Sequence, residues 1–462
     1  MPAGGTWVTQ NKRRPGAYIN YKAIKPSSQG LSDRGIIAVG LPLSWGPEGK
    51  LITLYGTDLL DGSSLAKVGA TAYTDNSLPF RVALRKCHTA LIWNTNTGGT
   101  KATSEITDSN TTATAKHPGV LGNNITVTIV ENKPETGKTT VQVLYNNLLQ
   151  ESFVVKSVEE FVAIDSKWVE FTCSAGSIPA TAGVKLSGGE DGTDAKDYSG
   201  MFKALATENW NCLAISGMGG DSGSVQTFEK QILSYRNDLG KKIQGVCYMD
   251  VEFSEGKPAA PYTDSEAIIA VRDGYVTGND HITKELFPVL AASLTAGAQV
   301  FESNTALVLE EYGAQIDDPV DANRIAEALE LGWFILSYRQ DGAICVEQDI
   351  NTLRTFGDDK NYSFTKNRVI RTIDLIGNDI SLLFNKNYCG KVSNNEENRT
   401  VFKSEIINIM NQLQDLGAIQ NFLSVSDVSV MQGDAIDAVV VDLYVQPVDS
   451  MEKLYMTVYL NS

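Results

Sequence analysis

The sequence Gly-Asp-Ser-Gly at residues 220–223 could supply a nucleophile, because trypsin-like serine proteases carry these four residues around their catalytic serine. Ser222 would then need a histidine as general base and a buried aspartate to orient that histidine. The chain has three histidines, His88, His117 and His281, and none lies in surroundings typical of those enzymes. The flanking residues alternate strand and helix patterns, which does not fit a double β-barrel. We predict a Gly/Ser loop between a strand and a helix.

Two other loops resemble binding motifs without completing them. The sequence Gly-Pro-Glu-Gly-Lys at 46–50 lacks the earlier glycine of a phosphate loop, since position 44 is serine. Leu51 stands where a phosphate loop has Ser or Thr to bind magnesium. The acidic stretch 190–197 has Thr193 at the third position of a calcium loop and no glycine at the sixth. No cofactor is expected, with weak calcium binding at 190–197 left as an alternative.

The six cysteines are scattered and form no Cys-x-x-Cys pair, which argues against a zinc or disulfide framework. We expect buried thiols in a reducing compartment. They are Cys87, Cys173, Cys212, Cys247, Cys345 and Cys389.

The remaining chemically suggestive residues have structural explanations. The acidic pairs Glu310-Glu311 and Asp317-Asp318 are expected at solvated helix ends. The aromatic residues Trp333, Phe334 and Tyr338 are expected in a hydrophobic core rather than in a ligand site.

Composition narrows the class of protein. The chain has 462 residues, 42% of them hydrophobic, so several domains are expected. A net charge of −16 argues against nucleic-acid binding and against binding to an anionic membrane. The N-terminus has no signal-peptide core and no apolar run approaches a membrane span, so no direct membrane insertion is expected. We expect assembly in a cytoplasm.

Strand and helix patterns place these segments in an α/β protein with a small β domain inside it. Strands are predicted at 35–42 and 90–93, followed by an exposed boundary loop over 94–119. Residues 117–187 predict strands, with a hairpin turning at Asn146-Asn147. Residues 196–350 alternate helices and strands, as in an α/β domain.

Three helices are predicted from local signals. A capping-box pattern from Thr263 to Glu266 predicts a helix start, and Asp318 followed by Pro319 predicts another. The most regular apolar seam belongs to a helix from about Arg399. Its members are Phe402, Ile406, Ile409, Leu413 and Leu416.

Both ends of the chain predict strands that lack a nearby partner. Residues 14–21 form a short strand pattern, but the upstream residues hold no second strand and 22–30 is a polar linker. Within residues 453–460, Leu, Met, Val and Leu alternate with Tyr, Thr and Tyr. Both faces of this predicted strand are largely apolar or aromatic, so we expect other elements to cover both faces. Such strands must pair far along the chain or on another chain.

Over its full length the chain resembles contractile phage tail sheath proteins of Gram-positive phages and phage-tail-like particles. The resemblance rests on the order of several segments. These are GGTW, RPGAYINY, HPGVLGNNITV, SGGEDGT, DYSGMFKAL, SEAIIAVRDGY, ELFPVLAASLTAGA, VEQDINTL and AIDAVVVDLYVQPVDSMEKLYMTVYL.

The resemblance implies an α/β multidomain subunit with an inserted, outward-facing β domain and terminal arms that add strands to neighbouring subunits. It implies stacked hexameric rings around an inner tail tube, contraction that drives the tube through a bacterial envelope, and baseplate and tail terminator proteins as further partners. The expected divisions are an arm and linker at 1–30, a first sheath segment at 31–99, the β domain at 100–187, an α/β sheath domain at 188–350, and an inner domain with the C-terminal arm at 351–462.

The same resemblance assigns roles to residues. The N-terminal donated strand would comprise Gly16, Ala17, Tyr18, Ile19, Asn20 and Tyr21. The C-terminal donated strand would comprise Leu454, Tyr455, Met456, Thr457, Val458, Tyr459 and Leu460. Tube contact is assigned to a face of the 399–416 helix through Lys403, Asn408, Gln412 and Asp415, although the seam of that helix could instead be core.

Two alternatives stay open on the sequence. One is a secreted or surface-layer adhesive protein, which the β domain and its Thr/Asn loops would suit. The other is a hydrolase with an unrecognised site. No catalytic residue is proposed.

Overall fold

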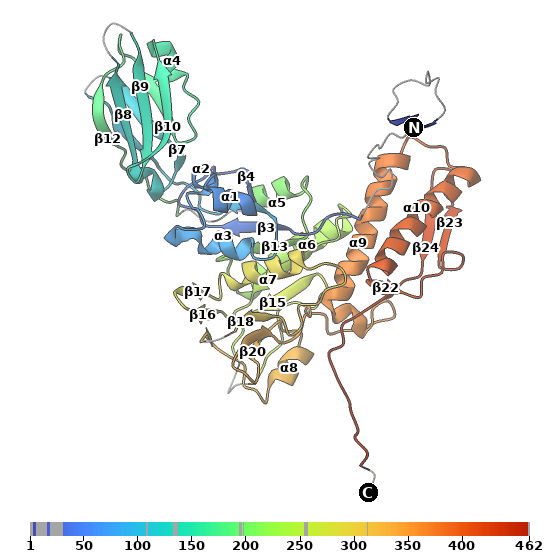
Figure 1. Cartoon of the computed structure of the whole chain (residues 1–462). Helices are drawn as coiled ribbons and strands as arrows, with labels where there is room; N and C mark the ends of the chain where they lie inside the picture. The colour runs from blue at the N-terminus through green and yellow to red at the C-terminus, as the bar shows by residue number, and fades with distance from the viewer. Residues whose placement is uncertain are drawn as a thin grey trace.

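A computed structural model describes residues 31–107, 110–132, 137–193, 196, 198–253, 257–311 and 313–460, and the backbone of two short strands near the N-terminus. The chain folds into a central α/β region, a β-sandwich at one end and a helical C-terminal region at its side (Figure 1). This is the mixed α/β, multidomain fold that the sequence predicted.

The centre is a six-stranded sheet of order β15-β14-β13-β3-β5-β4, in which only the edge strand β4 is antiparallel. Its strands are mainly apolar because helices cover both faces. One face packs on α7, whose residues are all buried, and the other packs on α6. The elements are β3 (Ile36–Leu41), β4 (Leu51–Tyr55), β5 (Thr89–Asn94), β13 (Cys212–Ile215), β14 (Gln244–Tyr248), β15 (Ile268–Val271), α1 (Gly56–Asp61), α2 (Ser64–Val68), α3 (Leu78–Ala83), α5 (Ser199–Leu205), α6 (Ser222–Asn237) and α7 (Phe287–Gly297).

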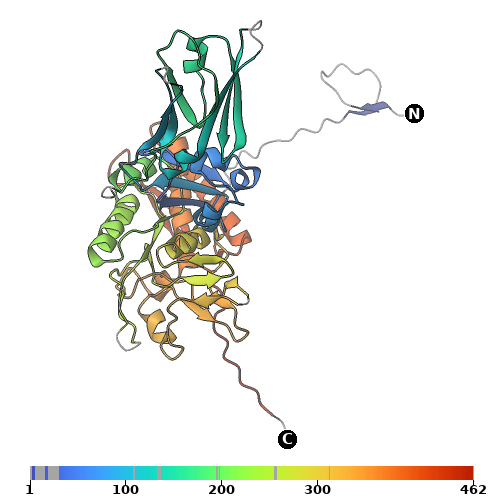
Figure 2. The same cartoon turned by 90° about the vertical axis from the view of Figure 1, so that its left-hand side faces the viewer.

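The β-sandwich is inserted between β5 and β13 and projects from the body (Figure 2). A four-stranded sheet of order β10-β9-β8-β12 faces a three-stranded sheet of order β11-β7-β6. The hairpin turn is confirmed, since Asn146 and Asn147 have φ angles of 50° and 63°. The elements are β6 (Lys101–Glu105), β7 (Thr111–Pro118), β8 (Ile125–Glu131), β9 (Thr139–Tyr145), β10 (Leu148–Val155), β11 (Val169–Cys173), β12 (Thr181–Lys185) and α4 (Val158–Val162).

The prediction of an exposed loop over 94–119 was wrong, because β6 and β7 lie in it. The segment is polar on one face only. Its inward positions Ala102, Ala113 and Ala115 are fully buried, and alanine gives a weak apolar signal. Threonine, which occupies the outward positions 103, 112 and 114, is β-branched and favours strands.

Two small three-stranded sheets and a short helix complete the central region. Both predicted helix starts there were wrong. Thr263 hydrogen-bonds the Thr352 hydroxyl and the chain continues into β15, whereas α8 begins only at Ile325, with Arg324 as its N-cap. The elements are β16 (Tyr275–Thr277), β17 (Asp280–Ile282), β18 (Val308–Glu310), β19 (Gln315–Ile316), β20 (Leu336–Tyr338), β21 (Ile344–Val346) and α8 (Ile325–Glu330).

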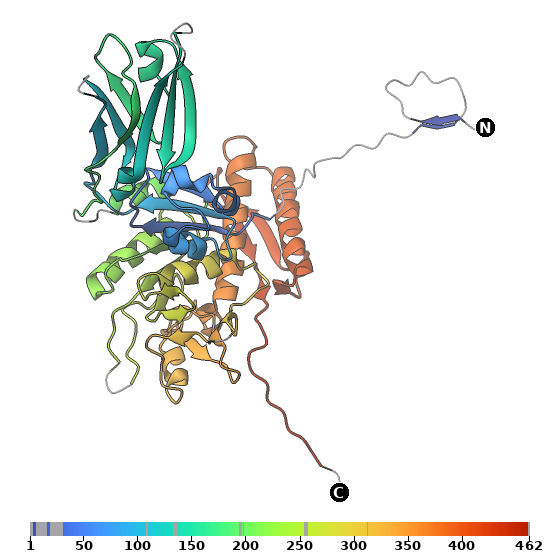
Figure 3. The same cartoon turned by 60° about the vertical axis from the view of Figure 1, so that its left-hand side comes forward.

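The C-terminal region consists of two long helices and two two-stranded sheets beside the central sheet (Figure 3). A turn of π-helix at Phe384–Tyr388 follows the first helix. None of the helices in the described ranges is long and apolar enough to cross a membrane. The elements are α9 (Asn367–Leu383), α10 (Glu396–Asp415), β22 (Ile419–Gln420), β23 (Val428–Gln432), β24 (Val439–Leu443) and β25 (Gln446–Pro447).

Candidate assembly surfaces

The C-terminal arm leaves the body as an extended segment that touches little of its own chain. Residues 453–460 pair with no described strand, and the arm points away from the β-sandwich (Figures 1 and 3). Its large apolar side chains are almost fully exposed, from 67% at Val458 to 93% at Leu460. Soluble proteins rarely expose such a contiguous apolar segment unless a partner covers it. The same holds for Leu454, Tyr455, Met456 and Tyr459, and Thr457 is also exposed.

Glu452 fixes the root of this arm to the body. Its carboxylate pairs with Lys366 and accepts hydrogen bonds from Gln348 (2.6 Å) and Thr305 (2.7 Å), and the Glu452 and Lys366 side chains are 10% and 7% exposed. Burial alone raises the pKa of Glu452, but the hydrogen bonds from Lys366, Gln348 and Thr305 outweigh it and lower the pKa. The arm therefore begins at Lys453 from a fixed point.

The N-terminal arm is described only as backbone at two places. Ala3–Gly5 pairs in parallel with Gly16–Tyr18, so the expectation that no upstream strand exists was wrong. A three-residue segment rich in glycine has no strand propensity to detect, because only its backbone groups make the pairing. Ile19, Asn20 and Tyr21 lie outside the described residues.

The root of the N-terminal arm is also fixed. The Ser32 backbone N–H and hydroxyl both donate to the Asp379 carboxylate, and the buried Arg34 donates to the carbonyl oxygens of Thr295 (3.0 Å) and Ala298 (2.9 Å). Asp379 lies near the C-terminal end of α9, and Lys366 is the N-cap of the same helix. Helix α9 thus holds one arm root near each end.

Buried ion pairs tie α9 to the central region. Asp374 accepts two hydrogen bonds from Arg236 (2.7 and 2.8 Å), and Arg371 pairs with Asp349 at 2.9 Å, with both of those side chains 1% exposed. A pair buried so deeply strongly destabilises the fold if one partner is removed. These contacts fix α9 to the central region.

The best candidate to receive an extra strand is the hairpin β23–β24. Of the described strands, only β23 pairs with β24, so each has an open edge. Two strands alone are marginally stable, and a third strand adds hydrogen bonds and apolar cover. Met431 and Val440 on the hairpin are 51% and 43% exposed, and Tyr444, just beyond it, is 70% exposed.

Helix α10 packs its seam into the core instead of presenting it to a partner. Phe402, Ile406, Ile409 and Leu413 are buried against α9 and the hairpin, whereas Leu416 is 45% exposed. Among the predicted tube contacts, Asn408 and Asp415 are exposed and Gln412 is half-buried on the same outer face. Lys403, also half-buried, lies on the flank of the helix away from these three, because three to four residues make one turn.

The motifs that hinted at catalysis do not assemble into a site. Ser222 begins α6 after its N-cap Asp221, as the predicted loop requires. Each histidine has other neighbours: His88 pairs with Asp33 and His281 with Asp317. His117 packs edge-on against Trp45, with ring centroids 5.1 Å apart.

The other binding-motif candidates are likewise structural. The loop 46–50 leads into strand β4 and not into a helix, unlike a phosphate loop. Asp191 of the acidic stretch accepts hydrogen bonds from Ser44 and the Val120 backbone, while 194, 195 and 197 lie outside the described residues. All six cysteines are free; four are buried, Cys173 is half-buried and Cys389 is exposed.

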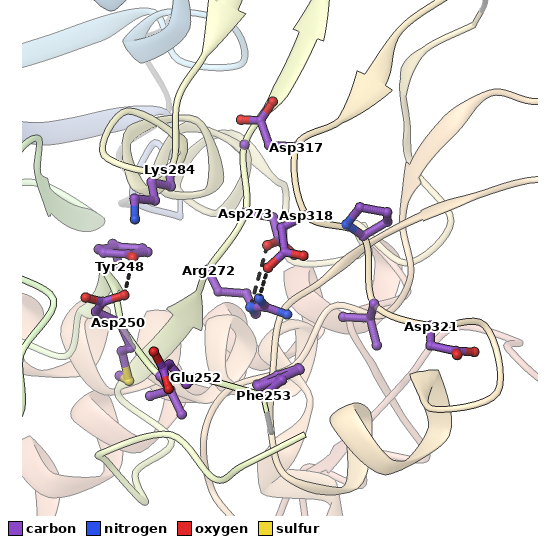
Figure 4. A pocket seen from close by; sticks show the side chains of 15 residues that line it. Tyr248, Asp250, Glu252, Phe253, Arg272, Asp273, Lys284, Asp317, Asp318 and Asp321 are labelled. Atoms are coloured by element: carbon purple, nitrogen blue, oxygen red, sulfur yellow. Dashed lines mark hydrogen bonds and ion pairs between the residues drawn. The ribbon is translucent and has the colours of Figure 1, made fainter. Parts of the chain in front are cut away.

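The central region also contains an acidic hollow of about 500 Å³ at the carboxyl ends of β14 and β15 (Figure 4). Arg272 stacks on Phe253, 4.0 Å from the ring centroid, and pairs with Asp318, while Asp273 beside it is buried. Burial raises the pKa of Asp273 to about 7. The lining includes no histidine, serine or cysteine, and in the described ranges no three His, Cys, Asp or Glu residues converge to hold a metal ion.

The acidic pairs were placed wrongly from sequence. Asp317 and Asp318 line this hollow in a loop, and Glu310 ends β18 and pairs with Arg85. Trp333 and Phe334 are buried as predicted, whereas Tyr338 is 48% exposed.

Comparison with known proteins identifies the family. The phage tail sheath protein beta-sandwich domain matches residues 97–191, the phage tail sheath protein central domain matches 191–352, and the phage tail sheath C-terminal domain matches 359–461. The phage-like element PBSX protein XkdK of Bacillus subtilis (strain 168) is 30% identical over 488 residues, covering 99% of this chain and 100% of that protein.

Solved structures agree with this assignment. The sheath tail protein from Desulfitobacterium hafniense matches with a TM-score of 0.75 and 35% identity, covering 96% of this chain and 99% of that one. The anti-feeding prophage helical sheath in its contracted state shares the fold at a TM-score of 0.53 and 13% identity, covering 98% of this chain and 100% of that one. The adhesive and hydrolase alternatives are therefore not favoured, and the protein is structural rather than enzymatic. The chain belongs to the phage tail sheath family and is a structural subunit of a contractile sheath, part of a phage virion or phage-tail-like particle.

Proposed function

We propose that copies of this subunit polymerise by lending their terminal arms as strands to the β23–β24 hairpins of neighbouring copies. The observation that carries the proposal is the C-terminal arm, which exposes six large apolar side chains beyond a firmly anchored root. The hairpin supplies two open edges, and strand addition to an open edge satisfies backbone donors and acceptors on both sides.

Magnitudes favour assembly through many weak exchanges. Burying the four aliphatic side chains of the arm contributes about 1.5–3 kcal/mol each. Ordering the backbone costs about 1–2 kcal/mol per residue over the eight residues 453–460. The two contributions are of similar size, so one exchange alone stabilises little, and assembly requires that every copy in a polymer both gives and receives a strand.

Charge distribution supports a second contact between copies. Residues 1–30 contain five basic residues and no acidic one, so the net charge of −16 divides into +5 on the N-terminal arm and −21 on the rest. An arm of this sign is attracted to the acidic body of another copy and offsets the repulsion between bodies. The basic residues are Lys12, Arg13, Arg14, Lys22 and Lys25.

The further architecture follows from the family resemblance. Six subunits form each ring, rings stack around an inner tail tube, and baseplate and terminator proteins close the two ends. The outer face of α10, with Asn408, Gln412 and Asp415, contacts the tube, and Lys403 contributes from the flank. The inserted β-sandwich faces outward.

Contraction is then a rigid-body rearrangement of subunits to a better-packed lattice. Helix α9 and the central sheet move as one body because of their buried ion pairs, while the arms keep neighbours connected. A small gain per subunit, summed over many copies, drives the tube through a bacterial envelope without nucleotide hydrolysis.

Hydrogen exchange tests the strand donation. Backbone amides of 453–460 should exchange fast in free subunits and become strongly protected in polymers that electron microscopy shows to be tubes. Amides of the buried strand β13 provide the control, since they should be protected in both samples. Tubes in which 453–460 still exchange as fast as in free subunits would refute the proposal.

A further inference from the structure

A preformed apolar groove lies where the π-helical turn after α9, the start of α10 and the tip of the β23–β24 hairpin meet. Its volume is about 560 Å³. Phe402 forms the floor between two other rings, with centroids 5.7 Å from Phe384 and 4.7 Å from Tyr388. At the rim, Ile436 is 85% exposed and Val392 is 40% exposed. A partly aromatic hollow with exposed aliphatic side chains at its mouth is suited to apolar side chains.

The hairpin tip is held over this groove by a side chain from the far rim. Asn394 donates hydrogen bonds to the carbonyl oxygens of Ile436 (2.9 Å) and Ala438 (2.8 Å), and Arg399 donates to Asn394 in turn (2.8 Å). The groove therefore keeps its shape before any partner arrives, which lowers the entropic cost of binding.

Strand β24 places the groove beside an open edge. Its first residue, Val439, lines the groove, and the burial of β24 alternates, with Val439, Val441 and Leu443 half-buried and Val440 and Asp442 exposed. A strand added along that edge would follow the same alternation, because side chains on neighbouring strands share faces. Every second side chain of the added strand would turn toward the groove.

The subunit's own C-terminal arm cannot lie across this groove. The arm starts from Glu452, held at the N-terminal end of α9, whereas the groove follows the C-terminal end of that helix. The helix spans about 25 Å at 1.5 Å per residue. Residues 453–460 reach about 26 Å when fully extended, so only the tip of the arm could touch the groove.

We propose that the aliphatic face of the C-terminal arm of another copy, Leu454, Met456, Val458 and Leu460, covers this groove, while Tyr455, Thr457 and Tyr459 face outward. This inference rests on the proposed strand donation and specifies which face of the donated strand contacts the groove. The lining is mainly apolar, which favours the aliphatic side chains, and tyrosine and threonine suit a solvated sheet face.

Cys389 provides a reporter inside the groove, because it is an exposed free thiol that lines it. Single cysteines are introduced at each position from 454 to 460, polymers are assembled and mildly oxidised, and disulfide-linked dimers are measured on non-reducing gels. At least two of the four even-numbered positions should crosslink several-fold more than positions 455, 457 and 459. Each crosslink should vanish with Cys389→Ser, which excludes the half-buried Cys173 as the partner.

The outcomes separate this inference from strand donation itself. Crosslinks at odd-numbered positions, or none at any position, in polymers whose residues 453–460 are protected from hydrogen exchange would overturn the groove assignment and leave strand donation intact. Unprotected arms would overturn both.

A second measurement identifies the occupant independently of crosslinking. Maleimide labelling of Cys389 should fall at least tenfold when purified subunits polymerise without tube protein. Protection only after tube protein is added would assign the groove to the tube and refute the inference.

Discussion

The β-sandwich and the C-terminal region are both rich in antiparallel strands, but they differ in how they cover their apolar faces. The sandwich closes two sheets on one core, in which Ile125, Val141 and Phe161 are fully buried. As far as the structure describes it, the C-terminal region has only two-stranded sheets, and its last described segment exposes side chains such as Leu454 and Leu460. A region that completes its own hydrophobic core tolerates sequence changes on its surface, whereas a region with an open sheet depends on a neighbouring subunit to cover its apolar side chains.

The largest expected effect is on the open region. Deleting residues 453–462 should abolish tube formation because the donated strand is lost, as judged by electron microscopy. The melting temperature of the monomer should change little, since these side chains contact almost nothing in the free subunit.

The matched control lies in the closed region. Replacing Leu148 and Leu149, 68% and 56% exposed on the sandwich edge, by aspartate should leave tube formation unchanged. Loss of tubes with this double variant, or normal tubes from the truncated chain, would reverse the comparison.

The second effect concerns the buried charges that hold the arm-bearing helix. Asp349→Asn leaves the guanidinium of Arg371 without its counter-charge at 1% exposure and should cost about 3–5 kcal/mol in the free energy of unfolding. Glu170→Gln removes the exposed ion pair with Lys101 in the sandwich and should cost at most about 1 kcal/mol. Urea denaturation of both variants measures the contrast, and equal losses would show that α9 is not fixed by its ion pair.

Acid should weaken the two regions in different pH windows. Burial, followed by the charges of Lys101 and Lys116, lowers the pKa of His117 to about 4. The pKa of His117 in the folded chain lies below the ordinary 6.5, so protonation of this histidine favours the unfolded chain. The stability that the neutral His117 gives the sandwich is therefore fully present above pH 6.5 and is lost as pH falls toward 4. The lowered pKa of Glu452 has the same sign, but its contribution is lost only below about 4.5.

Stability measured between pH 8 and 3 separates the two groups. The variant His117→Asn should flatten the dependence between pH 6.5 and 4, and Glu452→Gln should flatten it only below 4.5. An unchanged slope between pH 6.5 and 4 in His117→Asn would mean that another group governs the sandwich.

The smallest effect concerns the N-terminal arm. Replacing Lys12, Arg13 and Arg14 with glutamine should raise the protein concentration needed for tube formation several-fold at low salt and less at 0.5 M salt, because salt screens charge attraction. Light scattering against salt concentration measures this. An equal shift at all salt concentrations would exclude an electrostatic role for the arm.

The sequence predicted those parts of the fold that are encoded by local patterns. The α10 seam and the Asn146-Asn147 hairpin have regular apolar spacing or a specific turn chemistry. Strands β6 and β7 were not predicted from the sequence, because their inward positions hold alanine instead of larger apolar residues and the alternating pattern is weak. The capping-box pattern at Thr263 led to a wrong prediction of a helix, because the Thr263 hydroxyl donates a hydrogen bond to Thr352, 89 residues away, instead of capping a helix.

The anchors of the arms could not be predicted, because their partners are remote in sequence. Glu452 lies 86 residues from Lys366 and 147 from Thr305, and Ser32 lies 347 from Asp379. Four charged residues of α9 are buried among its apolar side chains, and their presence on a mainly core-facing helix was a signal that buried pairs exist; they are Arg368, Arg371, Asp374 and Asp379. The open C-terminal arm was visible in the sequence as a strand without a partner, whereas the partner of the strand at 16–18 was missed.

The most direct test of the account is a cryo-EM structure of the assembled sheath at a resolution that places backbone atoms. The account predicts that residues 454–460 form a hydrogen-bonded ladder with the β23–β24 hairpin of a different copy. A map in which this segment binds only its own subunit, or projects unpaired in the finished particle, would contradict it.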